Sequence, residues 1–553
     1  MLLLFTKVLQ SLALQMAKIS LSFHALRETR AFSNLVLDYI EGKSSLREAF
    51  PHNTEIDSII EAAQLQQVRD LSIRHGVANR IHELYACIEE PKIDAHQMER
   101  LSHENTRFIV TAHQPILLGG PLYVLYKLSS VVALAKRLNE HPNKKDLHFV
   151  PLYWVGDEDH DLEEIGHCYV LGKKLSWTPN QRGATGRMLI ENAEEFLTPL
   201  EAILGNRPES ARWMRLARDC YRNGITLLEA TVRWTDALFG SAGLVAFSGD
   251  DPRLKKMAIQ LWEREISERF SASAAQKGGE KLIEMGYHAQ ITPREVNLFW
   301  LEEESRMRMV RREDGRWQAG EQYWADDQDI GHQAEANPGK LSPNVVLRPL
   351  YQEYLLQSAA FVGGPAEVAY WLQLHPVFQE AGVDFPPVLL RASMMLMDAA
   401  MGKRRDQYGL VDALLFQSKA EWIRYYLDHE SESGLSDLVL MDHVRRGYTR
   451  LSEEAAEIDP GLRSYVLAEL NKVEKSIESI AQRVLKARKK KNEVQINRLQ
   501  QLHDRLFPDG KLQERHDNFL GWVASDTKNE LMDHCLNHLD YPTNKLALMQ
   551  LSE

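Results

Sequence analysis

The stretch from Arg107 to His167 constrains the fold of this chain most strongly. Phe108 to Thr111 is a short apolar, β-branched run and Phe149 to Val155 is a second apolar run without polar alternation, so both predict buried strands. Between them, Tyr123 to Leu138 carries apolar residues at helical spacing and ends with basic residues, which oppose the negative end of the helix dipole. A strand, a helix and a strand of these lengths form a βαβ unit, and continuous apolar strands indicate a parallel sheet.

Polar side chains follow both predicted strands. His113 and Gln114 follow the first strand, and the acidic cluster Asp157 to Asp161, which includes His160, follows the second. In open α/β sheets ligands bind at the edge where the strands end, so this edge is the predicted site. If a short helix comes next, His160 and Glu164 lie on one face of it.

The acidic cluster allows two kinds of chemistry and one purely structural explanation. Histidine beside carboxylates could bind a divalent metal ion, or it could act as a general base on an amine or a hydroxyl group. The spacing differs from the H-E-x-x-H pattern of zinc enzymes, which disfavours a dedicated zinc site. Acidic residues are also favoured in the first turn of any helix. Because a strand that ends in WVGDEDHD carries more charge than capping requires, we favour a functional site.

The triplet Gly-Gly-Pro occurs twice, at Gly119-Gly120-Pro121 and at Gly363-Gly364-Pro365. Each copy follows an apolar run and precedes a predicted helix that bears aromatic residues. Proline is favoured at the first helical position, and glycine before it would let an anion approach free backbone N–H groups. The alternative is that both triplets are only tight turns, because neither belongs to a P-loop or a GxGxxG motif.

Composition narrows the class of protein. A hydrophobic content of 44% and a charged content of 26% describe a soluble globular protein, and the net charge of −12 argues against a general nucleic-acid binder. The four cysteines have no paired spacing, which fits a reducing cytoplasm. The apolar N-terminus is too short and interrupted to span a membrane. We interpret residues 1–15 as an appended helix or as upstream codons before a start at Met16.

The length of 553 residues predicts about three domains or sub-domains. Residues 1–105 read as a helical segment that packs on the core, and residues 106–398 read as the α/β core, with an antiparallel insertion around 287–340. Residues 399–506 change to long helical patterns, and residues 507–553 return to the core.

The helical region contains a predicted arm. Val473, Ile477, Ile480 and Val484 keep near-heptad spacing, so we expect them on a buried seam. A single helix up to Leu506 would be about 70 Å long at the α-helical rise. An upstream helix would make it an antiparallel hairpin, and a second protomer would cover the remaining apolar face.

Several motifs resemble those of a known family. They are TAHQPILLGGPLYVLYK, VPLYWVGDEDHDLEEIGH, LRPLYQEYLLQSAAFVGGPAEVAYW, FPPVLLRAS and FPDGKLQER. In this order they span residues 108–519 and resemble the bacillithiol-biosynthesis cysteine-adding enzymes. Two departures affect the first motif, since Ala112 replaces the family's usual glycine and His113 stands where many members carry glutamine.

The resemblance implies a nucleotidylyltransferase-like Rossmann core with inserted connecting segments, a coiled-coil domain and a homodimer. It implies a ligase that adds L-cysteine to glucosaminyl-malate to give bacillithiol. Joining a carboxylate to an amine requires an activated carboxyl group, so we expect ATP. The alternatives are a nucleotidyl- or glycosyl-transferase that uses the same pocket, and a non-enzymatic scaffold built on the arm. We expect no nucleic-acid or membrane partner.

Under this resemblance, each polar residue has an expected role. The expected catalytic residues are His113, Asp159, His160 and Asp161, with His160 or Asp159 as the base that accepts the amine proton. His113 would polarise a phosphate leaving group, and Asp161 with Glu164 would hold Mg²⁺. The expected substrate- or nucleotide-binding residues are Gln114, Gly119, Gly120, Lys127, Arg348, Gly363, Gly364 and Arg391.

Overall fold

The structure is a computed structural model that describes residues 20–52, 54–430, 437–523, 526, 529–539 and 544–551. The chain forms two compact units. The first unit contains the residues up to Leu396 together with those from Lys511 onward, and the second unit contains residues 397–510. The interpretation of residues 1–15 and of a start at Met16 concerns residues outside the described ranges.

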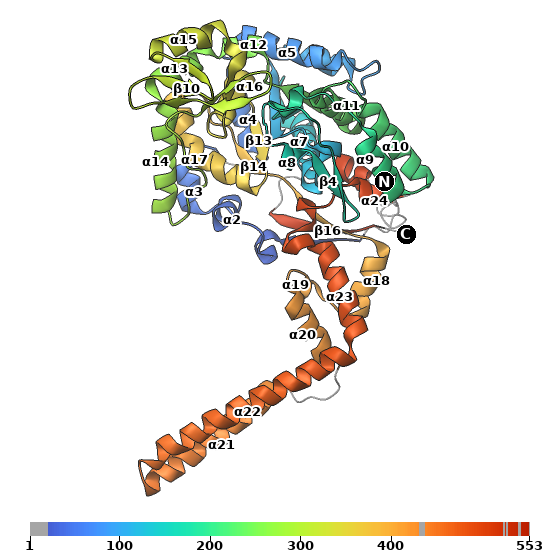
Figure 1. The fold of residues 1–553 in the computed structure, drawn as a ribbon, viewed down its shortest axis with the longest axis vertical. Coiled ribbons are helices and arrows are strands. Elements are labelled where there is room, and N and C mark those ends of the chain that lie inside the picture. Colours follow the sequence, from blue (N-terminus) through green and yellow to red (C-terminus); the bar gives the residue numbers. More distant parts are fainter. Residues whose placement is uncertain are drawn as a thin grey trace. The chain divides into compact units, whose positions relative to one another are not determined.

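A five-stranded parallel sheet forms the centre of the first unit (Figure 1). Its strands are, in spatial order, β14 (Val388–Leu390), β13 (Ala360–Gly363), β2 (Thr106–His113), β3 (His148–Val155) and β6 (Val245–Ser248). Nearly every residue of these strands is buried, which explains why the sequence shows continuous apolar runs without alternation.

The predicted βαβ unit is confirmed. Helix α7 (Leu122–Glu140) connects β2 to β3, and the two strands pair in parallel. Their register places His113 beside Val155, and the N–H of Gly156 donates to the carbonyl oxygen of His113 at 2.7 Å. The polar residues that follow the two strands therefore lie side by side.

The strand order reverses direction at β2. From β2 the chain continues to β3 and β6 on one side, and it later adds β13 and β14 on the other side. Helix α16 (Leu347–Leu356) precedes β13, and the helix predicted after the second Gly-Gly-Pro triplet is confirmed as α17 (Pro365–Ala381). The carboxyl ends of β2 and β13 thus flank the point where ligands bind in folds of this type.

Helices surround the sheet. Before it come α2 (Asn34–Ile40), α3 (Ser44–Ala49), α4 (Ile56–Leu65), α5 (Leu71–Tyr85) and α6 (Ala95–Arg100). After β3 come α8 (Leu162–Ile165), α9 (Glu194–Leu204), α10 (Pro208–Cys220), α11 (Leu227–Phe239), α12 (Pro252–Met257), α13 (Ile259–Glu268) and α14 (Phe270–Glu284). Near the C-terminus lie α24 (Leu520–Val523) and α25 (Glu530–Asp533).

The insertion is antiparallel, as predicted. One three-stranded sheet contains β12 (Leu341–Pro343), β7 (Leu298–Leu301) and β8 (Arg306–Arg308). The other contains β11 (Gln322–Trp324), β10 (Trp317–Ala319) and β9 (Val310–Arg311), and α15 (Asp327–Ala336) follows. A further sheet has the strand order β1 (Ser20–Ala25), β16 (Lys545–Gln550) and β15 (Ser393–Met397). A two-stranded sheet pairs β4 (His167–Val170) with β5 (Lys173–Ser176).

The second unit is helical. Its elements are α18 (Ala399–Gln407), α19 (Asp412–Leu415), α20 (Lys419–Glu430), α21 (Asp437–Ile458), α22 (Leu462–Lys491) and α23 (Glu493–Leu506). Helices α21 and α22 form the predicted antiparallel hairpin, in which Arg445 Nε lies 2.6 Å from Glu474 Oε1 (Figure 1). The predicted single helix to Leu506 is wrong, because Asn492 leaves the helical conformation and separates α22 from α23.

The expected buried seam is only partly buried within the helical hairpin of one chain. Val473 and Ile477 are half-buried, whereas Ile480 and Val484 are 58% and 44% exposed. A two-helix hairpin has too little surface to cover both sides of α22, so these residues remain in contact with water. Among the described helices, none combines the length and the apolar composition that a bilayer crossing requires.

Candidate active site

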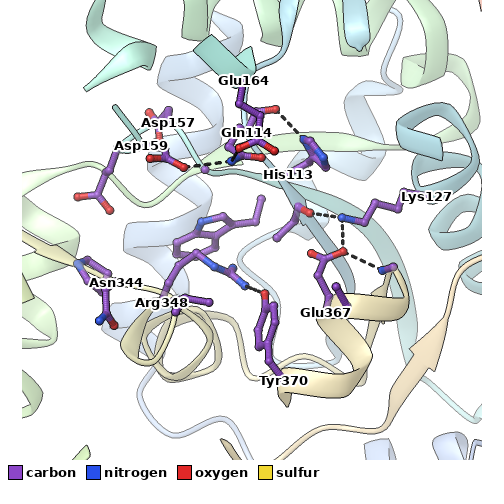
Figure 2. Close-up of a pocket in the computed structure, with 18 of the residues that line it drawn as sticks. His113, Gln114, Lys127, Asp157, Asp159, Glu164, Asn344, Arg348, Glu367 and Tyr370 are labelled. Atoms are coloured by element: carbon purple, nitrogen blue, oxygen red, sulfur yellow. Dashed lines mark hydrogen bonds and ion pairs between the residues drawn. The ribbon is translucent and has the colours of Figure 1, made fainter. Parts of the chain in front are cut away.

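A cavity of about 630 Å³ opens at the carboxyl edge of the sheet, in the size range of ligand sites (Figure 2). The ends of β2, β3 and β13 form its floor, and the insertion with α16 and α17 forms its opposite side. Of the residues expected from the sequence, the cavity is lined by His113, Gln114, Lys127, Asp159, Glu164, Arg348, Gly364 and Arg391. The structure therefore has a cavity at the edge where the sequence predicts the site.

Gln114 connects two of the acidic residues that line the cavity. Its side-chain Nε2 donates to Asp159 Oδ2 at 3.0 Å and to Glu164 Oε2 at 3.3 Å. Burial raises the pKa of Glu164, and the nearby charges of Asp161 and Asp159 raise it further. A carboxylate with a raised pKa accepts a proton more readily than an exposed one, which suits a general base.

His113 is a neutral imidazole with a defined tautomer. Burial, followed by the nearby charge of Lys127, lowers the pKa of His113 to about 3. Its Nδ1 lies 3.2 Å from the carbonyl oxygen of Gln114, which can only accept, so Nδ1 carries the proton. Nε2 then accepts a hydrogen bond from the hydroxyl of Tyr123 at 2.9 Å. Both nitrogens of this ring are already engaged.

Lys127 is engaged as well. Its buried ammonium donates to the carbonyl oxygen of Ala112 at 2.6 Å and forms an ion pair with Glu367. Glu367 also accepts the N–H of Gly364 at 2.7 Å, at the start of α17. Lys127 therefore joins the ends of β2 and β13 to each other and has little capacity left for a ligand.

Guanidinium groups also line the cavity. Arg294, Arg306 and Arg308 come from the insertion, and Arg348 comes from α16. Arg306 reaches the acidic side, where its Nη1 lies 3.7 Å from Asp159 Oδ1. Arg348 donates to Gln352 Oε1 at 2.8 Å and to the hydroxyl of Tyr370 at 3.3 Å, and neither acceptor is charged. Figure 2 shows Asp159 and Glu164 on one side of the cavity and Arg348 with Tyr370 on the other.

Arg391 borders the cavity beside Tyr123. It forms a buried, two-pronged ion pair with Glu514, with distances of 2.7 and 3.0 Å. Its guanidinium carbon lies 5.5 Å from the centre of the Tyr123 ring. Within the described chain, the Nε–H of Arg391 has no hydrogen-bond partner although it is buried. A buried donor without an acceptor costs free energy, so a ligand that accepts a hydrogen bond from this N–H would be favoured.

Comparison with known families shows to which family the chain belongs. A model described as the N-terminal Rossmann-like domain of bacillithiol biosynthesis BshC matches residues 17–392. A second model, described as the C-terminal coiled-coil domain of BshC, matches residues 394–551. The chain belongs to the BshC family.

Relatives that align with most of this chain share one name. A protein of Flavobacterium johnsoniae is 34% identical over 491 residues, which cover 88% of this chain and 92% of the relative. One from Flavobacterium psychrophilum is 32% identical over 93% of this chain and 96% of the relative, and one from Bacillus cereus is 26% identical over 90% and 95%. Each is named "Putative cysteine ligase BshC".

This BshC-family chain does not bring the first Gly-Gly-Pro triplet to the cavity. Gly119 and Gly120 have positive φ angles, and a Cβ on Gly119 would lie 2.7 Å from Nε1 of Trp234. The side chain of Asn518 donates to the carbonyl oxygen of Gly120 at 2.7 Å. This triplet is a tight turn fixed by tertiary packing, and the anion-binding expectation is corrected for it. Gly363 lies at the edge, where its carbonyl oxygen accepts the N–H of Arg391 at 2.9 Å.

His160 and Asp161 also lie outside the cavity lining. His160 is exposed, with its Nδ1 3.6 Å from Asp159 Oδ1. Asp161 Oδ1 accepts the N–H of Glu164 at 3.2 Å and so caps α8. Among the described residues, no group of three or more His, Cys, Asp or Glu side chains is arranged to hold a metal ion. Mg²⁺ that binds together with phosphate needs only one or two carboxylates from the protein. Of the two Mg²⁺ ligands expected from the sequence, Glu164 lines the cavity and Asp161 does not.

A buried ionic network supports the loop after β3. Lys255 donates to Asp250 at 2.8 Å and to Glu158, and Arg187 makes two hydrogen bonds of 2.7 Å to Asp250. Asp157 accepts from the hydroxyl of Ser248 at 2.7 Å, and burial together with the charge of Asp250 raises its pKa to about 7. These contacts hold the acidic loop against the neighbouring strand β6.

Sequence reasoning missed the residues that the insertion contributes. Arg294, Arg306 and Arg308 are far along the chain from the strand ends. The sequence pattern around them does not indicate that they face the parallel sheet. The dense run RMRMVRR from Arg306 to Arg312 was the signal that could have indicated an anion-binding surface. Tyr123 and Tyr370 were hidden in helical patterns that also suit a core.

Proposed function

We propose that this chain is a ligase that joins the carboxyl group of L-cysteine to the amine of glucosaminyl-malate and so forms bacillithiol. One observation carries the proposal: the cavity has Asp159 and Glu164 on one side and Arg348 on the other. Glucosaminyl-malate has the complementary arrangement, with an ammonium group on the sugar and two carboxylates on the malate. The printed name of the relatives agrees with this activity.

The guanidinium side is suited to the malate group. Arginine binds carboxylates with two parallel hydrogen bonds, and Arg348 has only uncharged partners in the described chain. Arg294 and Arg308 extend the same side from the insertion. With the malate carboxylates bound there, the sugar amine extends toward Asp159 and Glu164.

The acidic side is suited to removing the amine proton. An ammonium group must lose a proton before its nitrogen can attack, and the acceptor must lie within hydrogen-bond reach. We assign this role to Asp159 with Glu164, because both line the cavity and share the Gln114 amide. Of the two bases expected from the sequence, Asp159 lines the cavity and His160 lies outside the lining. His113, expected to polarise a phosphate leaving group, has both ring nitrogens bonded within the fold.

ATP is the proposed co-substrate, and it supplies the energy that converts the cysteine carboxylate into an acyl donor. The buried Nε–H of Arg391, together with Arg515 and the backbone at the start of α17, would hold the phosphate groups. Mg²⁺ would be held by the phosphate oxygens and its own water molecules, which leaves Glu164 available to accept the amine proton. We place the reaction in the cytoplasm, where thiols such as the four unpaired cysteines stay reduced.

Reconstitution tests the proposal. The purified chain is incubated with L-cysteine, glucosaminyl-malate and ATP, and mass spectrometry follows bacillithiol while a coupled assay follows release of ADP or pyrophosphate. We expect one nucleotide product per bacillithiol and no product when any substrate is omitted. Nucleotide turnover that needs glucosaminyl-malate but not cysteine would contradict the ligase and favour a transferase that uses the same pocket.

A further inference from the structure

A second cavity, of about 420 Å³, lies at the opposite edge of the parallel sheet. Ser358 and Ala359 border it just before β13, and Pro386 and Pro387 border it just before β14. Strands that end at the candidate active site therefore begin here. Helix α4 and the second half of α17 complete the lining.

The chemistry of this second cavity differs from that of the first. Its walls are largely apolar and include the rings of Phe378 and Phe385. Asp384, which is exposed, is the single carboxylate of the lining, and no lysine or arginine is among the lining residues of the described chain. An anionic ligand would thus meet a negative charge and no compensating cation.

A buried polar atom of the lining also favours a ligand. Gln66 lines the cavity, and in the described part of the chain its buried side-chain Oε1 has no hydrogen-bond partner. His375 is nine-tenths buried and also lines the cavity, and its ring packs against Phe50 and Phe385. Burial lowers the pKa of His375 to about 4, so the ring stays neutral. An unpaired buried acceptor is stabilised by any ligand that donates a hydrogen bond to it.

We propose that the second cavity binds a small organic ammonium compound with an apolar ring, at a site separate from the ligase reaction. The ammonium group lies at the mouth with Asp384, and the apolar ring packs against Phe385, since Phe378 has no exposed surface. The ammonium group of the ligand stays at the mouth because Lys281 adds positive charge near His375 and would repel it. Lys281 is held there by a hydrogen bond of 3.3 Å to the carbonyl oxygen of Ala49.

Helix α17 passes from one cavity to the other. Glu367 and Tyr370 on its first turns line the candidate active site, and His375 and Phe378 further along line the second cavity. A ligand in the second cavity therefore contacts the same rigid element that positions the Lys127–Glu367 ion pair.

Three probes with one ring test the charge preference. Calorimetric titration of the full chain with benzylammonium, benzyl alcohol and benzoate compares a cation, a neutral group and an anion of similar size. We expect benzylammonium to bind about fivefold more tightly than benzyl alcohol, as for one partly exposed ion pair, and benzoate not to bind. Equal binding of all three, or no saturable binding of benzylammonium below about 10 mM, would overturn the proposal.

Variants test the location. Asp384→Asn should remove the preference for benzylammonium over benzyl alcohol, whereas Glu61→Gln, a matched loss of an exposed charge on α4 outside the lining, should keep it. Ala62→Leu adds volume to the half-buried lining of the cavity and should weaken binding of both probes. If benzylammonium binds the Ala62→Leu and Asp384→Asn variants as tightly as the original chain, the site lies elsewhere and the proposal is wrong.

Discussion

Gln114 determines the geometry of the acidic side of the active site. Its side-chain amide donates to Asp159 and Glu164. Its backbone carbonyl oxygen accepts from His113 Nδ1 and from the hydroxyl of Tyr153 at 3.0 Å. One residue thus fixes both the carboxylate pair and the tautomer of the neighbouring imidazole. This function in positioning replaces the substrate-binding role expected from the sequence, because the side-chain N–H groups are already used.

We predict that Gln114→Met moves the acidic limb of the kcat/KM profile to higher pH. A hydrogen bond to an ionised carboxylate lowers its pKa, so loss of the amide raises the pKa of Glu164 further, and the base form is present only at higher pH. We expect a shift of about one pH unit, the equivalent of one hydrogen bond to a charged group. Gln276→Met, which removes a similar bond to Glu280 on the surface of α14, is the control. An unmoved limb would show that Gln114 does not position the base.

The general-base assignment predicts large losses for two conservative substitutions. Asp159→Asn and Glu164→Gln should each lower kcat by roughly a hundredfold, the usual scale for a positioned acid or base. Since both side chains are at least partly exposed, the free energy of unfolding should change by less than about 1 kcal/mol. Glu163→Gln, in the same short helix but outside the cavity lining, is the matched control. Full activity of both variants would exclude this pair as the base.

At the scale of elements, the strands and their polar ends could be predicted because continuous apolar runs leave little choice of environment. His113, Gln114 and the acidic loop followed directly from that topology. The two Gly-Gly-Pro triplets could not be distinguished locally, because one is surrounded by Trp234 and Asn518, which come from distant parts of the chain. The break between α10 and α11 cannot be recognised from the sequence for a different reason. Trp213 to Leu238 has continuous helical periodicity, yet the side chain of Thr226 accepts the N–H of Glu229 and starts a new helix.

The ionic network behind the acidic loop predicts a strong effect on stability. Lys255 is fully buried between Asp250 and Glu158, so Lys255→Met would leave buried carboxylates with less compensation. We expect a loss of about 3–5 kcal/mol in the free energy of unfolding by urea, the range for one broken buried ion pair. Lys256→Met, at an exposed position next to it, should cost less than about 1 kcal/mol. Equal stabilities of the two variants would contradict the structural role of this network.

At the scale of the whole molecule, the sequence predicted a helical arm but not its breaks or its exposed apolar face. We propose that a second copy of the chain covers this face and forms a homodimer. Ile480→Lys combined with Val484→Lys should then produce monomers in sedimentation velocity, because charges would be buried between protomers. Ser476→Lys with Gln482→Lys adds the same charge at exposed polar positions of α22 and should leave the dimer intact. If the original chain sediments as a monomer, the proposed dimer is wrong.

The insertion shows why whole-molecule arrangement limits prediction from sequence. Its short strands were identified as antiparallel, but their position over the sheet edge depends on tertiary contacts such as the buried Glu265, which accepts the N–H of Asn297 at 3.0 Å. The guanidinium side of the active site thus exists only in the folded chain. For this reason the acidic half of the site was predictable, whereas in the basic half only Arg348 and Arg391 were expected and the arginines of the insertion were not.

Substrate discrimination by Arg348 tests the central claim most directly, namely that the guanidinium side binds the malate group while the acidic side receives the amine. The measurement compares kcat/KM for glucosaminyl-malate with kcat/KM for methyl glucosaminide, which lacks both carboxylates. Our account predicts that Arg348→Met lowers kcat/KM for glucosaminyl-malate by about tenfold to a hundredfold, as for a lost charged hydrogen bond, and leaves the value for methyl glucosaminide nearly unchanged. Arg137→Met, at an exposed position near the end of α7, should change neither value. An equal loss for both substrates, or no loss for either, would contradict the account.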